Sequence, residues 1–148
     1  MTKCHVFRGI LQLNIELRKI LFRKGHNLVD YDVLKYNPNF QYDKIIMNPP
    51  YENGNDILHL LHCFKLLKLN GIIACILPES SFIPPKQVGY ERWQKDWLGN
   101  GEIKEINEYL FELLKSNDSK VFELGNVFEQ SDVPDDVLTR MVIIRKLN

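Results

Sequence analysis

The chain has 148 residues, 45% of them hydrophobic and 26% charged, and its 19 basic and 19 acidic side chains give a formal net charge of zero. This length and composition predict a single domain with an apolar core and exclude a chain that is disordered throughout. Zero net charge excludes a strong overall attraction to polyanions, so any affinity for nucleic acid has to come from local patches.

The N-terminal part of the chain alternates between strand and helix patterns. Residues 5–13 predict a strand and residues 16–23 a helix, and the apolar pair Leu28-Val29 predicts a second strand, which Asp32 follows. Strands that alternate with helices are typical of an α/β fold with a largely parallel sheet. We therefore expect Asp32 at the carboxyl end of its strand, where ligands bind in such sheets.

The most informative segment is Asn48-Pro49-Pro50-Tyr51, which follows a predicted strand over residues 42–47 and precedes a predicted helix. Each proline fixes its own φ angle and holds the preceding residue extended, so the backbone at Asn48 and Pro49 is rigid. The Asn48 side-chain oxygen and the Pro49 carbonyl oxygen can then each accept one proton of a planar NH2 group. Because neither proline has an N–H, these acceptors are not quenched locally.

This arrangement indicates methylation of an exocyclic amine. The lone pair of an aromatic amine is delocalised, and acceptors on both of its protons favour the pyramidal form that can attack a methyl group. Tyr51 offers a flat ring for a base, a stacking contact worth roughly 1–3 kcal/mol, and a base in a duplex has to be flipped out to reach it. The structural alternative is a turn that ends a strand, because a motif match is only a hypothesis until its context agrees.

The middle of the chain predicts one helix and one buried strand. Apolar residues recur at helical spacing from residue 55 or 56, Asn55 or Asp56 being the cap, to about residue 69, and Gly71 is expected to end this helix. The apolar run 72–77 then predicts a strand that is buried on both faces.

Cysteine and histidine residues give no sign of a metal site or a disulfide framework. His59, His62 and Cys63 have helical spacing, but no third and fourth ligand matches them, so we expect packing at the core boundary. The cysteines Cys4, Cys63 and Cys75 lack a disulfide spacing, which suits a reducing compartment. No apolar run approaches the roughly 20 residues of a membrane helix, and no signal-peptide core is present. We therefore expect a cytoplasmic protein without membrane contact.

The C-terminal half predicts a loop over residues 80–89, helices over 90–98 and 102–115, and strands over 121–124 and 138–145. The acidic connection between those strands disfavours contact with DNA. Basic and aromatic side chains interleave around the first of these helices, a pattern found both on nucleic-acid surfaces and on helices anchored to a core. These side chains are Lys86, Arg92, Trp93, Lys95 and Trp97.

At residues 48–51 the chain resembles the adenine-specific DNA methyltransferases, which use S-adenosylmethionine and carry an Asn-Pro-Pro-Tyr or Asn-Pro-Pro-Phe motif. Other segments resemble consecutive blocks of that family, from about Gln12 to the last strand but without residues 99–121. They are Lys24-Gly25-His26-Asn27-Leu28-Val29, Asp32, residues 42–51, Leu66-Leu67-Lys68-Leu69-Asn70-Gly71, Ile76-Leu77-Pro78-Glu79 and Thr139-Arg140-Met141-Val142-Ile143-Ile144. The resemblance implies a Rossmann-like methyltransferase sheet that closes with an antiparallel hairpin at the C-terminus.

The resemblance also implies roles for individual residues. Asp32 matches an aspartate that accepts a hydrogen bond from the adenine amine of the cofactor; alternatively, it is a solvated turn carboxylate. Gln12 stands where the family has an acidic residue for the ribose hydroxyls; it lacks that charge and is equally compatible with an ordinary strand end. Asn48 is expected to contact the cofactor as well as the target. The motif residues that bind the target amine and base are Asn48, Pro49, Pro50 and Tyr51.

Two family features are missing from the sequence. The glycine-rich cofactor loop has no counterpart, because the one Gly-x-Gly, Gly99-Asn100-Gly101, does not follow a strand. The first strand, which the family places between the strands that end at Gln12 and Met47, is missing as well. Residues 1–148 therefore resemble a single partial catalytic domain, truncated at the N-terminus. We expect the gap to close by direct pairing of the flanking strands or by a partner chain, such as a second copy.

The expected function is S-adenosylmethionine-dependent methylation of the adenine amine in DNA, in a restriction–modification, phage or mobile-element setting. Activity then requires that the cofactor loop is supplied in trans or is dispensable. Two alternatives stay open. One is methylation of another planar nitrogen, such as a guanine amine in RNA or a glutamine amide in protein. The other is a non-catalytic remnant that keeps the fold and binds a partner.

Overall fold

The structure is a computed structural model that describes residues 9–11, 15–30, 32–83, 94–95, 104–127 and 137–148. The strands are β1 (Gly9–Leu11), β2 (Asn27–Asp30), β3 (Tyr42–Met47), β4 (Leu67–Pro78), β5 (Gln94–Lys95), β6 (Lys104–Glu105), β7 (Asp118–Gly125) and β8 (Thr139–Arg145). The helices are α1 (Ile15–Arg23), α2 (Asn55–Lys65) and α3 (Ile106–Ser116), with short 3-10 turns η1 (Val33–Lys35), η2 (Glu52–Gly54) and η3 (Glu79–Phe82).

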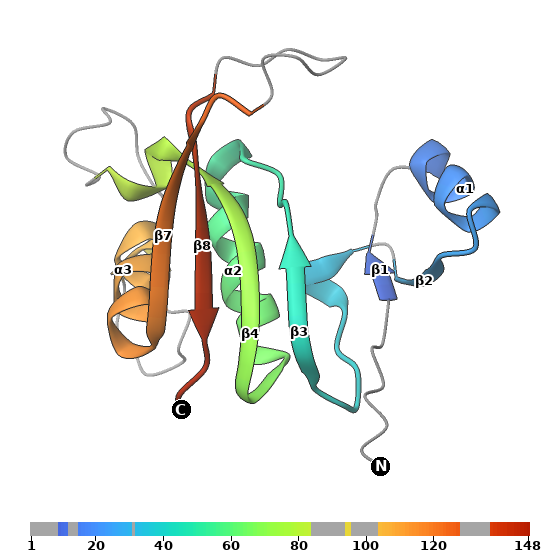
Figure 1. The fold of residues 1–148 in the computed structure, drawn as a ribbon, viewed down its shortest axis with the longest axis horizontal. Coiled ribbons are helices and arrows are strands. Elements are labelled where there is room, and N and C mark those ends of the chain that lie inside the picture. The colour runs from blue at the N-terminus through green and yellow to red at the C-terminus, as the bar shows by residue number, and fades with distance from the viewer. Residues whose placement is uncertain (1–8, 12–14, 31, 84–93, 96–103, 128–136) are drawn as a thin grey trace.

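A four-stranded mixed sheet forms the centre of the molecule, with the strand order β3-β4-β8-β7 (Figure 1). Strands β3 and β4 are parallel, and β8 is antiparallel to both β4 and β7. The β7–β8 pair confirms the predicted closing hairpin, and β3 begins and ends at the predicted residues. Two further pairs, β1–β2 and β5–β6, form separate two-stranded sheets. The fold is therefore α/β, as the sequence predicts.

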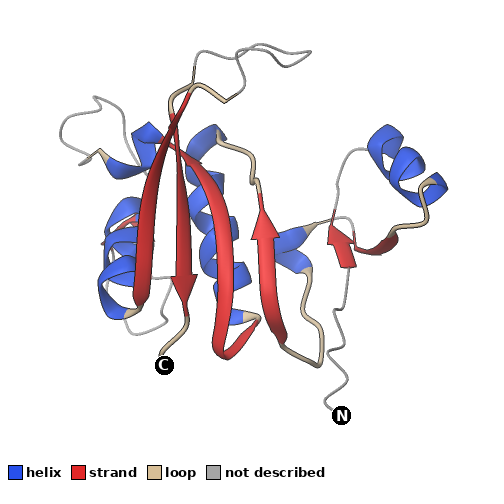
Figure 2. Cartoon of the chain, in the orientation of Figure 1, coloured by secondary structure: helices blue, strands red, loops and turns tan. Residues whose placement is uncertain are grey.

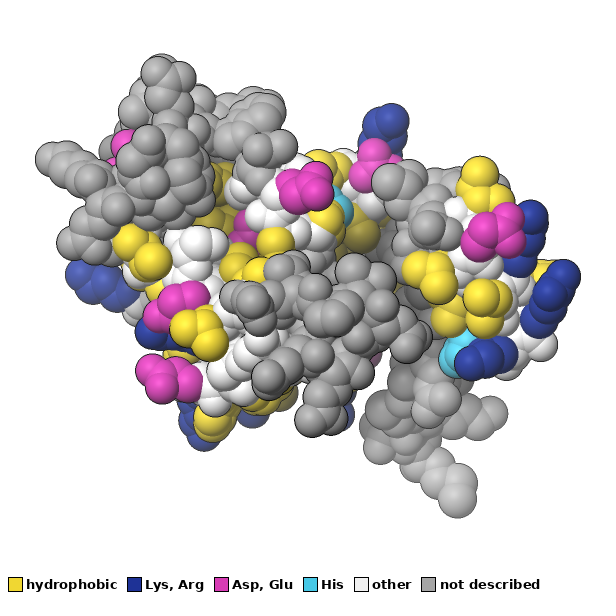
Figure 3. All heavy atoms as spheres, turned by 90° about the horizontal axis from the view of Figure 1, so that it is seen from above, with side chains coloured by type: hydrophobic (Ala, Val, Ile, Leu, Met, Phe, Trp, Pro, Cys, Tyr) yellow, Lys and Arg dark blue, Asp and Glu magenta, His cyan; other side chains and the backbone are white. Residues whose placement is uncertain are grey.

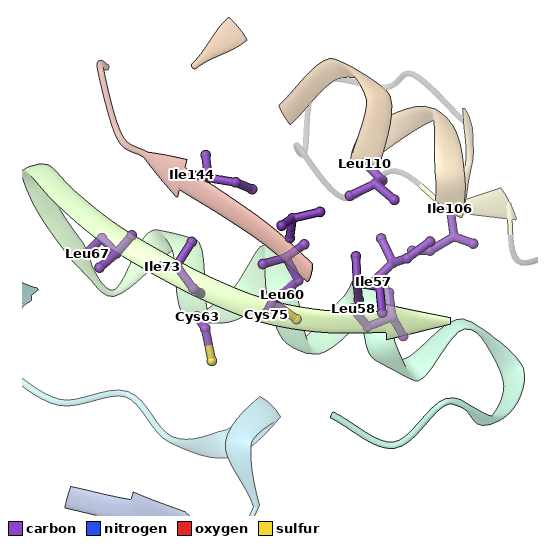
Figure 4. Close-up of a cluster of buried hydrophobic side chains, with 12 residues drawn as sticks. Ile57, Leu58, Leu60, Cys63, Leu67, Ile73, Cys75, Ile106, Leu110 and Ile144 are labelled. Atoms are coloured by element: carbon purple, nitrogen blue, oxygen red, sulfur yellow. The ribbon is translucent and has the colours of Figure 1, made fainter. Parts of the chain in front are cut away.

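Helices α2 and α3 cover one face of this sheet (Figure 2). Alternate residues of β4 point to that face, and its Ile73, Cys75 and Leu77 are fully buried. Ile57 and Leu60 of α2 pack against them in the core, as Figure 4 shows. Each fully buried Ile or Leu side chain contributes roughly 1.5–3 kcal/mol to this packing. The core therefore holds α2 and β4 in fixed register, and with them the segment that leads from β3 into α2.

The end of α2 is a correction to the sequence prediction. The helix ends at Lys65 rather than near residue 69, and β4 already begins at Leu67. Asn70 takes a left-handed conformation with φ of 62° and its N–H donates to the Lys146 carbonyl oxygen at 2.8 Å. Leu67 pairs with Tyr42 of β3, and the Gly71 carbonyl oxygen accepts a hydrogen bond from the Lys146 N–H. Gly71 therefore lies inside β4 rather than at a helix terminus.

The start of α2 also differs from the prediction. Gly54, with φ of 73°, occupies the N-cap position, and neither Asn55 nor Asp56 caps the helix. An added Cβ at Gly54 would lie 3.3 Å from the Cγ2 atom of Ile106, so α2 begins in close contact with α3. Asp56 is instead buried and accepts a hydrogen bond from the Ser81 hydroxyl.

The predicted helix over residues 90–98 is wrong where the structure describes it. Gln94 and Lys95 form β5 and pair with β6 in antiparallel fashion. Because Lys104 and Glu105 belong to that pair, α3 begins at Ile106 rather than near residue 102. The acidic connection over residues 129–136, Gln12, Cys4 and the Gly99-Asn100-Gly101 turn lie outside the described residues. The described part of the chain contains no helix long and apolar enough to cross a membrane.

Candidate functional site

The carboxyl edge of the four-stranded sheet carries the Asn-Pro-Pro-Tyr segment that the sequence singles out. β3 and β4 run parallel and end at Met47 and Pro78, and β8 runs the other way and begins opposite Pro78 at Thr139. The segment 48–51, hereafter the 48–51 loop, leaves β3 at this edge and continues through η2 into α2. Figure 3 looks onto the edge from above. In open α/β sheets this is where ligands bind.

The 48–51 loop presents one polar side chain and buries one proline. Asn48 and Pro50 are exposed, Pro49 is buried, and Tyr51 is half-buried. A buried Pro49 anchors the loop on the protein, because its ring leaves water while its φ angle stays fixed. The amide of Asn48 is therefore at the surface, next to a buried proline.

Asn48 and Tyr51 contact each other directly. The Tyr51 hydroxyl donates a hydrogen bond of 3.0 Å to the Asn48 side-chain oxygen. This contact modifies the expectation that the Asn48 oxygen has no local donor, since the prolines lack an N–H but the tyrosine supplies an O–H. An amide oxygen has two lone pairs, so Asn48 can accept a second hydrogen bond from a bound amine. The contact orients the amide before any ligand is present.

Asp32 lies at the carboxyl end of β2, at the start of η1. One of its oxygens accepts a hydrogen bond of 3.0 Å from the Leu34 N–H, and the other lies 3.8 Å from the Lys35 ammonium group. Its side chain is 35% exposed, so the carboxylate reaches water while its direction is fixed by the turn. This arrangement fits a carboxylate that accepts from an amine at the protein surface.

Electrostatics link Asp32 to helix α2. Burial lowers the pKa of His59 on α2, and the charge of Asp32 acts in the opposite direction, while His62 adds to the lowering. η1 packs against α2, and the 48–51 loop leads into the same helix. Asp32 and the 48–51 loop therefore both border α2.

A polar network behind the 48–51 loop was not predicted from the sequence. Asp56 in the first turn of α2 is only 2% exposed, and buried Ser81 of η3 donates to its Oδ2 atom. Next to it, the Arg140 guanidinium forms a two-pronged pair with Glu79, with one Nε–Oε2 distance of 2.6 Å. Buried polar groups at the end of an apolar strand are a weak sequence signal, since the partners lie 25 and 61 positions apart.

The histidine and cysteine side chains on α2 lie at the boundary of the core. His62 donates from Nε2 to the Tyr36 carbonyl oxygen at 2.8 Å, and burial raises the pKa of the Cys63 thiol to about 12. Within the described part of the chain, no three His, Cys, Asp or Glu side chains are grouped to hold a metal ion.

Helix α1 and the turn that follows it carry basic side chains. Several of the described Lys and Arg side chains lie at the α1 end of the view in Figure 3. Helix α1 and the turn after it carry Arg18, Lys19, Arg23 and Lys24. Of the predicted cluster around residues 86–97, the structure describes only Lys95, and the rest falls outside the described residues.

Comparison with solved structures identifies the fold. An rRNA methylase from Streptococcus thermophilus superposes with a TM-score of 0.52 at 11% identity, over 95% of this chain and 73% of the methylase. The PH0226 protein from Pyrococcus horikoshii OT3 gives 0.51 at 12% identity, over 93% and 70% of the two chains. A protein from Thermoplasma acidophilum gives 0.50 at 11% identity, over 93% of this chain and 56% of its own.

No family model matches the sequence, and no curated protein is similar to it. At such low sequence identities, a structural likeness establishes the fold and leaves the reaction to be argued from the site. The chain has the Rossmann-like fold of methyltransferases.

Proposed function

We propose that this protein transfers a methyl group from S-adenosylmethionine to the exocyclic amine of adenine in DNA. The observation that carries the proposal is the 48–51 loop at the carboxyl end of β3, with an exposed Asn48 amide that Tyr51 orients through a hydrogen bond of 3.0 Å. The Rossmann-like methyltransferase fold supports the same reaction class. We also propose that the protein is cytoplasmic.

Asp32 and Asn48 are the described residues that would hold the cofactor. The half-exposed Asp32 carboxylate can accept from the amine of its adenosine, and Asn48 faces the same edge of the sheet. S-adenosylmethionine supplies an electrophilic methyl group on a positively charged sulfur. We also propose that Gln12 binds the cofactor, because it stands where the resembled family has an acidic residue for the ribose hydroxyls.

The chain's own residues position and activate the amine. The Asn48 side-chain oxygen and the Pro49 carbonyl oxygen accept its two protons, which directs the nitrogen lone pair out of the base plane. The Tyr51 ring offers the stacking surface for a base that has left the duplex. In the transfer, the nitrogen–carbon bond would form as the methyl–sulfur bond of the cofactor breaks, which would leave a neutral thioether, and the nitrogen would release one proton to solvent. No general base is required before the transfer, because the lone pair and not a deprotonated nitrogen attacks.

A second acceptor class is RNA. The structural neighbour with a TM-score of 0.52 is an rRNA methylase, and a guanine amine presents the same planar NH2 group to Asn48. A glutamine amide in protein has that group too. A non-catalytic chain that keeps the fold is the alternative from a different functional class.

The test is methyl transfer from labelled S-adenosylmethionine to three acceptors: duplex DNA, a structured RNA and a glutamine-containing protein. We expect label on adenine in DNA, lost in Asn48→Ala and kept in the matched control Asn148→Ala, which changes an exposed asparagine at the C-terminus. Label on RNA or protein instead of DNA would contradict the proposal that DNA is the methyl acceptor. Cofactor binding without transfer to any acceptor would contradict the proposal that this chain catalyses methyl transfer.

A further inference from the structure

Turn η3 follows β4 at the same edge of the sheet as the 48–51 loop. β3 and β4 are parallel neighbours, and Met47, the last residue of β3, pairs with Cys75 of β4. β4 continues from there to Pro78 before η3 begins, and in Figure 1 the turn lies next to the start of α2. Ligands of open α/β sheets bind outside the carboxyl ends of the strands. The 48–51 loop and η3 therefore both border the edge at which a ligand binds.

Side chains of α3 and β8 hold η3 in place. The amide of Asn107, in the first turn of α3, donates to the Ile83 carbonyl oxygen directly after the turn, at 2.8 Å. Arg140 of β8 pairs with Glu79, and its guanidinium group lies 5.0 Å from the centre of the Phe82 ring. The turn therefore has a fixed position relative to the sheet and to α3.

A further contact joins η3 to the helix that continues the 48–51 loop. Asp56 lies in the first turn of α2, shortly after Tyr51, and is only 2% exposed. Its Oδ2 atom accepts a hydrogen bond from the hydroxyl of Ser81, which is 3% exposed. Burial raises the pKa of the Cys75 thiol on β4, and the nearby charge of Asp56 raises it further. The contact between Asp56 and Ser81 is therefore enclosed where α2 begins and β4 ends.

The short segment between Tyr51 and Asp56 is closely packed. It forms turn η2, and Gly54, with φ of 73°, leads the chain into α2. An added Cβ at Gly54 would lie 3.3 Å from the Cγ2 atom of Ile106 on α3. A displacement of the first turn of α2 is therefore passed on to the 48–51 loop.

A buried hydrogen bond of this kind adds little to stability. Asp56 loses its hydration when it leaves water, and the bond from Ser81 has to offset that cost. Two apolar side chains of similar shape would leave stability nearly unchanged. A hydrogen bond differs from an apolar contact because it is directional. The contact between Asp56 and Ser81 is therefore suited to fix one relative orientation of α2 and η3.

We propose that Asp56 and Ser81 are positioning residues, which set the place of the 48–51 loop relative to η3. Their hydrogen bond holds the first turn of α2 against η3, and through η2 it holds Asn48 and Tyr51 at a fixed distance from that turn. Both residues are buried, so they act through the loop rather than on a substrate. The effect on catalysis rests on the proposed methyl transfer, whereas the effect on the loop does not.

Two variants and one control test this role. Ser81→Ala removes the hydroxyl group and keeps Asp56. The double variant Asp56→Leu/Ser81→Ala replaces both partners by apolar groups, so its stability should stay close to that of the wild type. The control Ser119→Ala removes a serine hydroxyl near the start of β7, at the opposite edge of the sheet, which donates to the Leu114 carbonyl oxygen at 2.7 Å. Urea unfolding verifies that each variant is folded, and the double variant decides if Ser81→Ala is not.

The first readout is the NMR signal of the Asn48 side-chain NH2 group, identified by its loss in Asn48→Ala. The Tyr51 hydroxyl donates to the oxygen of the same amide, so this signal reports the geometry of the loop without any methyl transfer. We expect it to shift or broaden in Ser81→Ala and in the double variant, and to stay in place in Ser119→Ala. Wild-type signals in a folded Ser81→Ala variant or in the double variant would overturn the proposal.

Steady-state methyl transfer is the second readout. We expect kcat to fall by about tenfold or more in Ser81→Ala and in the double variant, with little change in KM for DNA, because a misplaced group slows the reaction. If the contact served stability alone, the double variant would react at the wild-type rate. An unchanged kcat in either variant therefore overturns the proposal. A wild-type chain without activity contradicts the proposed function instead, and the Asn48 signal then decides the positioning role by itself.

Discussion

The contact between Tyr51 and Asn48 divides the role of the tyrosine into two parts. The hydroxyl orients the Asn48 amide, and the ring offers a surface for a base. The sequence already places both residues in one rigid loop through the two prolines. It does not reveal their hydrogen bond, because the rotamer of a side chain is not encoded in the motif.

Two substitutions at Tyr51 separate these roles. Tyr51→Phe keeps the ring and removes the donor, so we expect a lower kcat for methyl transfer with little change in KM for DNA. Tyr51→Ala also removes the ring, and the loss of roughly 1–3 kcal/mol of stacking should raise KM by about 5- to 150-fold. Steady-state kinetics of both variants check this. Equal KM values for the two variants would contradict the stacking role.

The buried thiols predict how stability depends on pH. Burial raises the pKa of Cys63 from 9.0 to about 12 and raises that of Cys75 as well. Above pH 9 the unfolded chain loses these protons while the native chain keeps them, so the free energy of unfolding falls between about pH 9 and 12. Each such group contributes a slope of up to about 1.4 kcal/mol per pH unit.

Urea unfolding at several alkaline pH values measures this slope. Cys63→Ala lacks one titrating group, so its stability should decrease less steeply with pH, although the variant is less stable overall because it leaves a cavity. The same slope in the variant and the wild type would show that Cys63 does not titrate on unfolding.

At the scale of elements, β4 shows where local pattern and tertiary structure disagree. Leu67 continues the helical spacing of α2, yet it is fully buried as the first residue of β4. The Lys146 ammonium group donates to the Leu67 carbonyl oxygen at 2.9 Å. That partner is 79 positions away, so a sequence window cannot include it. The strands over 42–47 and 138–145 were predictable, because their apolar runs are bounded by clear turn residues.

The substitution Gly71→Ala tests whether β4 packs as tightly at this position as the structure shows. An added Cβ would lie 2.9 Å from the Lys68 carbonyl oxygen and 3.2 Å from those of Tyr42 and Asp43, all of them backbone atoms. We therefore expect Gly71→Ala to lower the free energy of unfolding by about 1–3 kcal/mol, as overpacking does. Thermal or urea unfolding measures the change.

The neighbouring residue provides the control. Asn70 already has φ of 62°, a conformation that glycine adopts without strain, so Asn70→Gly should change stability by only a few tenths of a kcal/mol. A Gly71→Ala variant as stable as Asn70→Gly would place Gly71 in a roomier environment than the structure shows.

For the whole molecule, the order of strands was largely predictable, because parallel strands joined by helices and a closing hairpin leave few topologies. The β1–β2 pair was not predicted to form a sheet of its own, apart from β3. The polar network of Asp56, Ser81, Glu79 and Arg140 was not predictable, since it depends on how η3 returns over α2. What the sequence could not supply are contacts between segments far apart in the chain.

The most direct test of the central claim, a cofactor site beside the 48–51 loop, is calorimetric titration of the purified chain with S-adenosylmethionine. We predict saturable binding with a micromolar Kd, weakened about tenfold or more by Asp32→Ala and unchanged by Asn148→Ala. We expect Asp32→Ala to weaken binding because the Asp32 carboxylate is an oriented hydrogen-bond acceptor at the end of β2. A folded chain that shows no binding, or equal binding with Asp32→Ala, would contradict the assignment of this site.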